Sequence, residues 1–264
     1  MRFYLGTHQP GWLDHVDFPL CVSHTRLSRD HILPEAREPV MIDSGAFSIL
    51  QRYGYYPDHH SPRRIRQWSA EEYYVWSVRR YVREIGHVEV VWPQDHMCEP
   101  AIINGGTFGR MRFAGTHLSV VEHQMRTIVN GMMLRDMAGE IPWRYVLQGF
   151  TRDDYVRCAD MYDAAGVDLT REPLVGLGSI CRRSATEEIG RVVAELHSMG
   201  IRLHGFGIKT TGLRKYGHLL TSADSMAWGE RGSHVPGCSP THATESNCLR
   251  FATAWRARLI GDAS

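Results

Sequence analysis

The sequence predicts an α/β protein built as a single-domain (β/α)8 TIM-like barrel, and three observations point to this class. Short apolar runs recur along the chain, and helical patterns separate the later runs. Several runs are continuous rather than alternating, which is typical of strands buried on both faces of a parallel sheet. A length of 264 residues is normal for one barrel unit. An open doubly wound sheet is the alternative that these observations leave open.

Eight candidate strands follow one another along the chain. They span residues 3–6, 20–23, 40–44, 88–92, 145–148, 174–178, 202–206 and 222–227. Because helices alternate with the later strands, we expect parallel pairing through right-handed crossovers. The carboxyl ends of such strands meet at one rim, which is where barrel enzymes carry their active sites.

Five helices are expected, over residues 69–85, 118–137, 151–165, 184–199 and 244–259. The first begins with the motif SAEE, in which Ser69 is the N-cap and Glu72 completes a capping box. The third opens on TRDD and ends before Gly166, as a helix with a left-handed cap does. Residues 54–61 and 104–115 are expected to be long loops. The second carries Arg110 and Arg112 among glycines, which fits either a lid over a phosphate-bearing substrate or a surface loop.

The charge balance predicts no long-range attraction to nucleic acid. The net charge is +1 and the isoelectric point is near 7.8, so nucleic-acid binding must depend on local basic patches. Clustered arginines offer such patches, although solvated helix faces are the other interpretation; these are Arg63, Arg64 and Arg66, then Arg79, Arg80 and Arg83, then Arg182 and Arg183.

The chain is expected to be cytoplasmic and to have no membrane association. Its first residues lack the pattern of a signal peptide, and no apolar run approaches the roughly 18 residues that a membrane span needs. In that compartment the six cysteines are expected to be thiols or metal ligands rather than disulfides.

Three aspartates stand at or just after the ends of predicted strands: Asp43, Asp95 and Asp224. A carboxylate in such a place is costly unless it is paired, hydrogen-bonded or used in chemistry, or unless it caps a helix. Three of them on one rim, beside glycine turns, favour a site. His8, His96 and His204 also lie at strand ends, where they either assist the site or pack in the core.

Separate carboxylates without an evident organic cofactor suit exchange at an anomeric carbon. One carboxylate traps the carbon covalently while another group moves a proton to and from the leaving group. Asp43 and Asp224 fit these two tasks, and Asp95 with Gln148 fits recognition of a polar heterocycle. The same residues also suit an aldolase, an isomerase or a metal-dependent hydrolase.

The motifs resemble those of the tRNA-guanine transglycosylase superfamily. DSGAFS is similar to the DSGGFQ segment of that family, and WPQD, LQG, GLGS, GFGIK and ADSMAW follow in the family's order. The opening FYLGTHQPGWL, the GFGIK element and the tail look like the DpdA branch, which is linked to inserting 7-deazaguanine bases into DNA. Ala46 replaces a glycine of the tRNA enzymes and the chain is short for them, so DNA is favoured over tRNA.

The resemblance implies a pentosyltransferase that exchanges guanine in DNA for a base such as 7-cyano-7-deazaguanine, with helper proteins as further partners. Asp224 would be the nucleophile and Asp43 the general acid and base. The implied substrate-binding residues are Asp95, Gln148, Gly149, Gly176, Leu177, Gly178, Phe47, Phe206 and Lys209. Arg182, Arg183 and the loop arginines would contact phosphates. A non-catalytic nucleic-acid-binding relative and an unrelated barrel enzyme acting on a small phosphorylated substrate are the alternatives.

The tail within residues 230–264 predicts a structural zinc loop followed by a terminal helix. His234, Cys238, His242 and Cys248 are spaced H-x3-C-x3-H-x5-C, and two thiols with two imidazoles fit a closed tetrahedral zinc site. The tRNA enzymes use three cysteines and one histidine at other spacings, and an ordinary polar loop is the alternative here. The other cysteines show no ligand spacing and are expected to be incidental thiols: Cys21, Cys98, Cys158 and Cys181.

Overall fold

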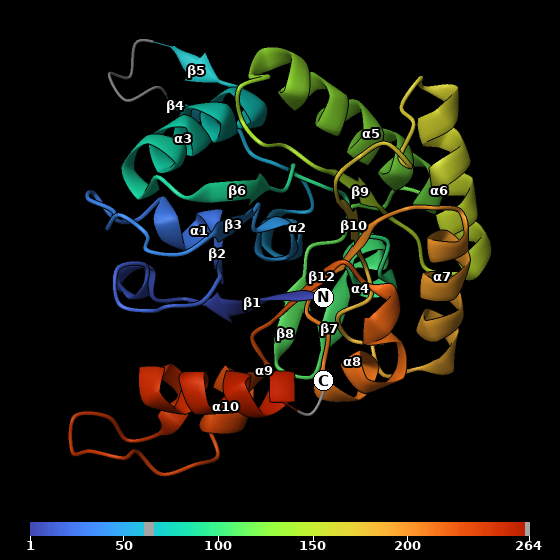
Figure 1. Ribbon diagram of the computed structural model, residues 1–264. Helices are drawn as coiled ribbons and strands as arrows, with labels where there is room; N and C mark the ends of the chain where they lie inside the picture. Colours follow the sequence, from blue (N-terminus) through green and yellow to red (C-terminus); the bar gives the residue numbers. More distant parts are fainter. Residues whose placement is uncertain (61–65, 262–264) are drawn as a thin grey trace.

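The computed structural model describes residues 1–60 and 66–261 and contains an eight-stranded, curled parallel sheet surrounded by helices (Figure 1). The strand order is β6-β3-β2-β1-β12-β11-β10-β9, and every neighbouring pair is parallel. The strands are β1 (Arg2–Thr7), β2 (Leu20–Ser23), β3 (Val40–Asp43), β6 (Val88–Val91), β9 (Tyr145–Leu147), β10 (Val175–Leu177), β11 (Leu203–Gly205) and β12 (Ser222–Ser225). All eight predicted strand segments are therefore confirmed.

The two edge strands of the sheet approach each other. Val91 at the end of β6 forms an isolated parallel bridge with Trp143, which stands just before β9. The Val91 N–H donates to the Pro142 carbonyl over 3.0 Å, and the Arg144 N–H donates to the Val91 carbonyl over 3.1 Å. The curled sheet is thus compatible with a TIM-like barrel and differs from the open doubly wound alternative.

Alternation along each strand divides the apolar side chains into two clusters. In β2, for example, Val22 packs in the large cluster between sheet and helices, whereas Cys21 belongs to a smaller cluster inside the curled sheet. The smaller cluster also contains Tyr4, Met41 and Trp92. Burial on both faces explains why the strands read as continuous apolar runs.

The long helices follow the predicted pattern and cover the outside of the sheet (Figure 1). They are α3 (Ala70–Ile85), α5 (Val120–Met137), α6 (Arg152–Ala164), α7 (Glu187–Ser198) and α10 (Leu249–Gly261). The predicted capping box of α3 is present, with Ser69 and Glu72 bonding each other's backbone N–H. None of the helices formed by the described residues has the length and hydropathy to cross a bilayer.

Two predicted helix starts are wrong. Helix α7 begins three residues later than predicted because Thr186 is its N-cap, while Ser184 is buried and its hydroxyl accepts the backbone N–H of Lys209. The last predicted helix is divided into a 3-10 turn, η3 (Glu245–Asn247), and α10, with Cys248 between them in extended conformation.

The predicted loop over residues 104–115 is instead an antiparallel hairpin of β7 (Gly106–Phe108) and β8 (Met111–Phe113). Gly109 turns the chain with a φ of 62°, a conformation that glycine adopts without strain. The hairpin packs on α2 (Ala46–Tyr53), where the Ala114 N–H donates to the Gln51 carbonyl over 2.8 Å. The other predicted loop, over residues 54–61, contains the short strand β4 (His59–His60). This strand pairs with β5 (Gln67–Trp68), which lies after the loop.

Short helices that were not predicted complete the fold. They are α1 (His24–Leu27), α2, α4 (Pro100–Asn104), α8 (Thr210–Tyr216) and α9 (Ala227–Gly232), with 3-10 turns η1 (Pro10–Trp12) and η2 (Gly217–Leu219). Of these, α2, α8 and α9 directly follow β3, β11 and β12, so they cover the rim where those strands end.

Candidate active site

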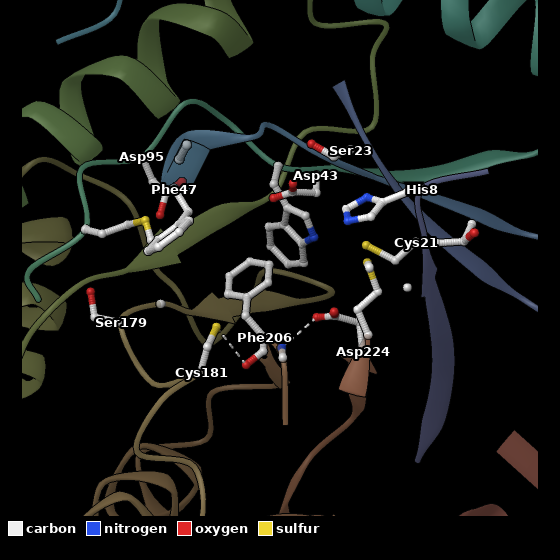
Figure 2. Close-up of a pocket in the computed structure, with 18 residues that line it drawn as sticks. His8, Cys21, Ser23, Asp43, Phe47, Asp95, Ser179, Cys181, Phe206 and Asp224 are labelled. Carbon is white, nitrogen blue, oxygen red and sulfur yellow. Dashed lines mark hydrogen bonds between the residues drawn. The ribbon is translucent and has the colours of Figure 1, made fainter. Parts of the chain in front are cut away.

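The three predicted aspartates meet in one cavity at the carboxyl ends of the strands. Asp43 ends β3, Asp224 lies in β12, and Asp95 follows β6. All three line a cavity of about 220 Å³, and Figure 2 shows them around the ring of Phe206. Pockets for drug-sized ligands have volumes of roughly 300–1,000 Å³. This cavity is smaller, so it suits a single heterocyclic base.

Asp224 is held by one of its two oxygens. Its Oδ1 accepts the Gly207 N–H over 3.0 Å and lies 3.2 Å from Nε2 of His204. His204 is fully buried, and its Nδ1 lies 2.9 Å from the Ser222 hydroxyl. Within residues 1–60 and 66–261, both hydrogen bonds to the carboxylate reach Oδ1, so Oδ2 is free to react. The His204 imidazole therefore fixes the orientation of Asp224.

Asp43 has the pKa of a group that exchanges protons near neutrality. Burial raises its pKa to about 6, and the nearby charge of Asp224 adds to this effect. Its Oδ2 accepts the Gly45 N–H over 3.1 Å, which holds the carboxylate at the start of α2. Gly45 has a φ of 76°, and a Cβ there would lie 2.5 Å from the Thr25 methyl group, so the turn requires glycine.

Asp95 is buried in a hydrogen-bonded network of polar side chains. Gln148 donates its amide N–H to Oδ2 of Asp95, and the Ser44 hydroxyl lies 3.5 Å from Oδ1. The side-chain carbonyl oxygen of Gln148 accepts a hydrogen bond from the Ser179 hydroxyl over 2.6 Å. Burial raises the pKa of Asp95 to about 7, with the charge of Asp43 as the next cause. Gln148 is itself fully buried, so its amide positions Asp95.

Aromatic rings form the walls of the cavity. The rings of Phe206 and Trp92 meet edge to face at 4.8 Å, and Phe47 lines the cavity as well. A Cβ at Gly176 would lie 2.7 Å from the Phe206 ring, so glycine at this position makes room for that ring. Flat apolar walls with carboxylates between them suit a planar, hydrogen-bonding ligand.

Five residues predicted to bind substrate, Gly176 among them, do not line this cavity. Gln148 lies behind Asp95, and Leu177 is buried in the large cluster between sheet and helices. At Gly149 a Cβ would meet the start of α6, at 2.9 Å from Asp154. Lys209 is exposed at the N-cap of α8. Of the glycines at the end of β10, Gly178 lines the cavity, and a Cβ there would lie 2.2 Å from the Gln148 amide.

Two cysteines that showed no pattern in the sequence also line the cavity. Cys21 lies in β2, and Cys181 follows β10, with its thiol donating to the Phe206 carbonyl over 3.4 Å. Burial raises the pKa of both thiols, so they stay protonated and act as apolar wall. In the sequence, only the alternation of side chains along β2 indicates that Cys21 points to the inside of the curled sheet.

The predicted arginine clusters differ in their surroundings. Arg63 and Arg64 lie outside the described residues. Arg79 on α3 pairs with Glu140 over 2.7 Å, as expected of a solvated helix face. Arg183 pairs with Glu188 over 3.2 Å, but it lies in the turn before α7 and its side chain is only 17% exposed. The exposed Arg182 instead lies over the ring of Phe47, 4.9 Å from its centroid.

A second cluster of polar side chains lies in the tail. Cys238, His242, Glu245 and Cys248 bring one ligand atom each to within 4.8 Å of one another. The isolated bridge between Pro236 and Thr244 folds the loop so that these residues meet. The donor set fits a tetrahedral metal site, and Glu245 has a buried Oε2 without a hydrogen-bond partner among the described residues.

His234, a predicted ligand, is not part of this cluster, in which Glu245 is the fourth member. His234 precedes the bridged loop, while Glu245 begins the 3-10 turn η3 and is only 1% exposed. The spacing C-x3-H-x2-E-x2-C was present in the sequence, but the search for cysteine and histidine ligands overlooked the carboxylate.

A curled parallel α/β sheet with carboxylates around a cavity at its carboxyl edge is compatible with a TIM-like barrel, the class of protein whose sites lie at that edge. A family model described as DpdA, DeoxyPurine in DNA protein A, matches residues 1–264, and the chain belongs to this family of 7-deazaguanine DNA modification. Membership implies a transglycosylase role in that modification. A search of curated proteins found no match.

Proposed function

We propose that this protein exchanges guanine in DNA for a 7-deazaguanine base, such as 7-cyano-7-deazaguanine, through a covalent aspartyl intermediate. One observation carries the proposal: three carboxylates in different settings face a single base-sized cavity with aromatic walls. Asp224 has an unengaged oxygen, Asp43 has a pKa of about 6, and Asp95 is oriented by an amide. These are the properties of a nucleophile, a proton carrier and a recognition group, respectively.

In the first half of the reaction, Oδ2 of Asp224 attacks C1′ of the target deoxyguanosine. The bond from C1′ to N9 breaks, and its electron pair leaves with the guanine, which takes a proton from the Asp43 carboxyl group. In the second half, Asp43 removes the N9 proton of the incoming base. N9 then attacks C1′ and displaces Asp224, so two inversions retain the sugar configuration.

The other cavity residues select and hold the base. Asp95, once ionised, accepts hydrogen bonds from the N–H groups on the guanine-like edge that both bases share. Phe206 and Phe47 offer ring faces for stacking. A base inside a duplex cannot reach a cavity of this kind, so the target must leave the stack or lie in a single strand.

We infer further that the tail cluster binds zinc in a structural role. The ligands would be the thiolates of Cys238 and Cys248, the His242 imidazole and the Glu245 carboxylate. Four protein ligands leave no position for a reacting water, so a bound zinc would stabilise the fold of the tail.

The proposal is tested with Asp224→Asn, which keeps the shape of the side chain and removes the nucleophile. We expect wild type to incorporate labelled guanine into DNA and the variant to lose at least a thousandfold in rate, as losses of covalent nucleophiles do. Asp160→Asn, at an exposed position on α6, is the matched control. Wild type should also form a denaturation-resistant adduct with DNA that the variant lacks.

Parallel reactions with DNA and tRNA decide the polymer. Label taken up by tRNA and not by DNA would replace the proposal with the tRNA activity. Label taken up by neither polymer, with DNA binding intact, would indicate a non-catalytic binding protein. Full exchange by Asp224→Asn would contradict the mechanism.

A further inference from the structure

The tip of the β7–β8 hairpin exposes apolar side chains beside arginines. Phe108 is 48% exposed and Met111 is 40% exposed, on either side of the turn at Gly109. Arg110 and Arg112 are exposed on the same hairpin. Large apolar side chains that stay this exposed bury only part of their surface in the fold, and adjacent exposed apolar groups are typical of surfaces that contact another molecule.

Edge-to-face ring contacts connect this tip to the cavity wall. The ring centroids of Phe108 and Phe113 lie 5.6 Å apart at an interplanar angle of 87°. Phe113 is buried, and its ring lies 6.0 Å from that of Phe47, which lines the cavity. Phe108 is therefore two ring contacts from the place where the proposed base binds.

A basic groove lies beside the hairpin. It has a volume of about 540 Å³ between α2 and the hairpin and is lined by Ser48, Gln51, Arg52, Arg112 and Ala114. The Gln51 amide donates to the Arg112 carbonyl over 3.2 Å, which fixes the hairpin against α2. Guanidinium, amide and hydroxyl groups along one groove are the donors that bind phosphates.

Four arginines around the hairpin form no ion pair within the part of the chain that the structure describes. Arg182 lies over the rings of Phe47 and Phe113, at 4.9 Å and 5.5 Å from their centroids. Among the ion pairs formed by residues 1–60 and 66–261, none involves the following arginines: Arg52, Arg110, Arg112 and Arg182. Their charge is complementary to a DNA backbone on this side of the cavity.

We propose that the hairpin is a wedge for duplex DNA. Phe108 enters the base stack and fills the vacancy that the target guanine leaves when it turns into the cavity, while the unpaired arginines hold the flanking phosphates. Apolar wedges of this kind stabilise unstacked steps in other DNA complexes. The inference rests on the proposed function, because that function requires the target base to leave the stack.

The wedge is tested by binding, without any need for base exchange. The probes are two fluorescein-labelled duplexes of one sequence, intact or with a single tetrahydrofuran abasic site, read by fluorescence anisotropy. A residue that fills a vacancy favours the abasic duplex, so we expect wild type to bind it about tenfold more tightly than the intact duplex. Phe108→Ala should abolish this preference, and Phe108→Trp should restore it. Val129→Ala, which removes a 61% exposed side chain from α5, is the control and should keep it.

The exchange assay then separates the wedge from the proposed function. Phe108→Ala should slow incorporation of labelled guanine into native DNA about tenfold and leave heat-denatured DNA within about twofold, since a single strand needs no wedge. Equal loss on both forms, or an abasic preference that survives Phe108→Ala, would overturn the wedge. Absence of exchange by wild type would remove the proposed function, while the abasic preference would still decide whether Phe108 fills a gap in DNA.

Discussion

At the scale of single residues, the three carboxylates are distinguished by their neighbours. Asp224 receives two hydrogen bonds on one oxygen, whereas Asp43 and Asp95 have pKa values raised by burial. Groups with a raised pKa carry protons near neutrality, and a carboxylate oriented through one oxygen can attack with the other. The chemistry therefore follows from placement, since all three side chains are the same.

The sequence was sufficient to find these aspartates because each is next to a readable apolar strand. It was insufficient for Gln148, whose position after β9 suggests a ligand contact. The structure shows its amide engaged by Asp95 and Ser179, a pairing across the sheet that no local pattern encodes. Glu245 was overlooked because carboxylates are common on surfaces, and only the folded loop shows that this one is buried.

The raised pKa of Asp95 makes a prediction for stability. A carboxyl group whose pKa is raised on folding stabilises the protein fully below its unfolded pKa, and this contribution is lost as the pH rises through about 7. Asp95→Asn removes the buried charge and can still accept the Gln148 N–H. We expect it to raise the free energy of unfolding by about 1–4 kcal/mol at pH 8 and to change little at pH 5. Urea denaturation at both pH values measures this, with the exposed Asp163→Asn as control. If Asp95→Asn were less stable than wild type at pH 8, the argument that burial of the charge is costly would be contradicted.

The same two pKa values predict how exchange depends on pH. Below about pH 6 both Asp43 and Asp95 are protonated, so the base loses its acceptor and the incoming base keeps its N9 proton. We expect kcat/KM for labelled guanine to rise by up to about a hundredfold per pH unit below about pH 6, about tenfold per unit between about pH 6 and about pH 7, and to level off above that. Asp95→Asn should lower the plateau and make the remaining rise depend on Asp43 alone. A kcat/KM that does not change between about pH 5 and about pH 8 would exclude Asp43 as the proton carrier.

At the scale of elements, helix ends were predicted better than short elements. The predicted caps of α3 and α6, in the motifs SAEE and TRDD, are formed by residues within one turn of each other, so four letters are enough to identify them. Hairpin β7–β8 and helices α2, α8 and α9 are too short for a periodic pattern and form because they pack on strand ends and on each other.

The capping box of α5 gives a prediction for this scale. The Ser119 hydroxyl accepts the Glu122 N–H over 3.2 Å, and the Glu122 carboxylate accepts the Ser119 N–H over 2.7 Å. Ser119→Ala leaves the Glu122 N–H without its acceptor and should lower the free energy of unfolding by about 1 kcal/mol. Ser119→Thr keeps the hydroxyl and should lose less than half as much. Equal losses in the two variants, measured by urea denaturation, would show that the cap is not what stabilises this end.

At the scale of the whole molecule, the parallel sheet was predictable because continuous apolar strands separated by helices permit few arrangements. The predicted barrel also requires β6 and β9, which are consecutive strands of the sheet, to be neighbours, and the bridge between residues 91 and 143 brings them together. The wedge geometry also exists only at this scale. It requires the hairpin after α4, the helix after β3 and the turn after β10 to meet beside the cavity.

The tail cluster connects the end of the chain to the rest of the molecule, so removal of its metal should lower the thermal stability of the whole protein. Loop 233–248 joins α9 to α10, and Trp255 of α10 packs on Phe3 of β1 at 6.2 Å between ring centroids. We expect protein purified with zinc to lose several degrees of thermal midpoint when treated with a strong chelator, and to regain them with added zinc. Cys248→Ala should show the lower midpoint and no response to chelator. His234→Ala is the matched control, because the structure excludes that imidazole from the cluster, and it should keep both the metal and the response. Stoichiometric zinc in Cys248→Ala, or its loss from His234→Ala, would contradict the ligand set.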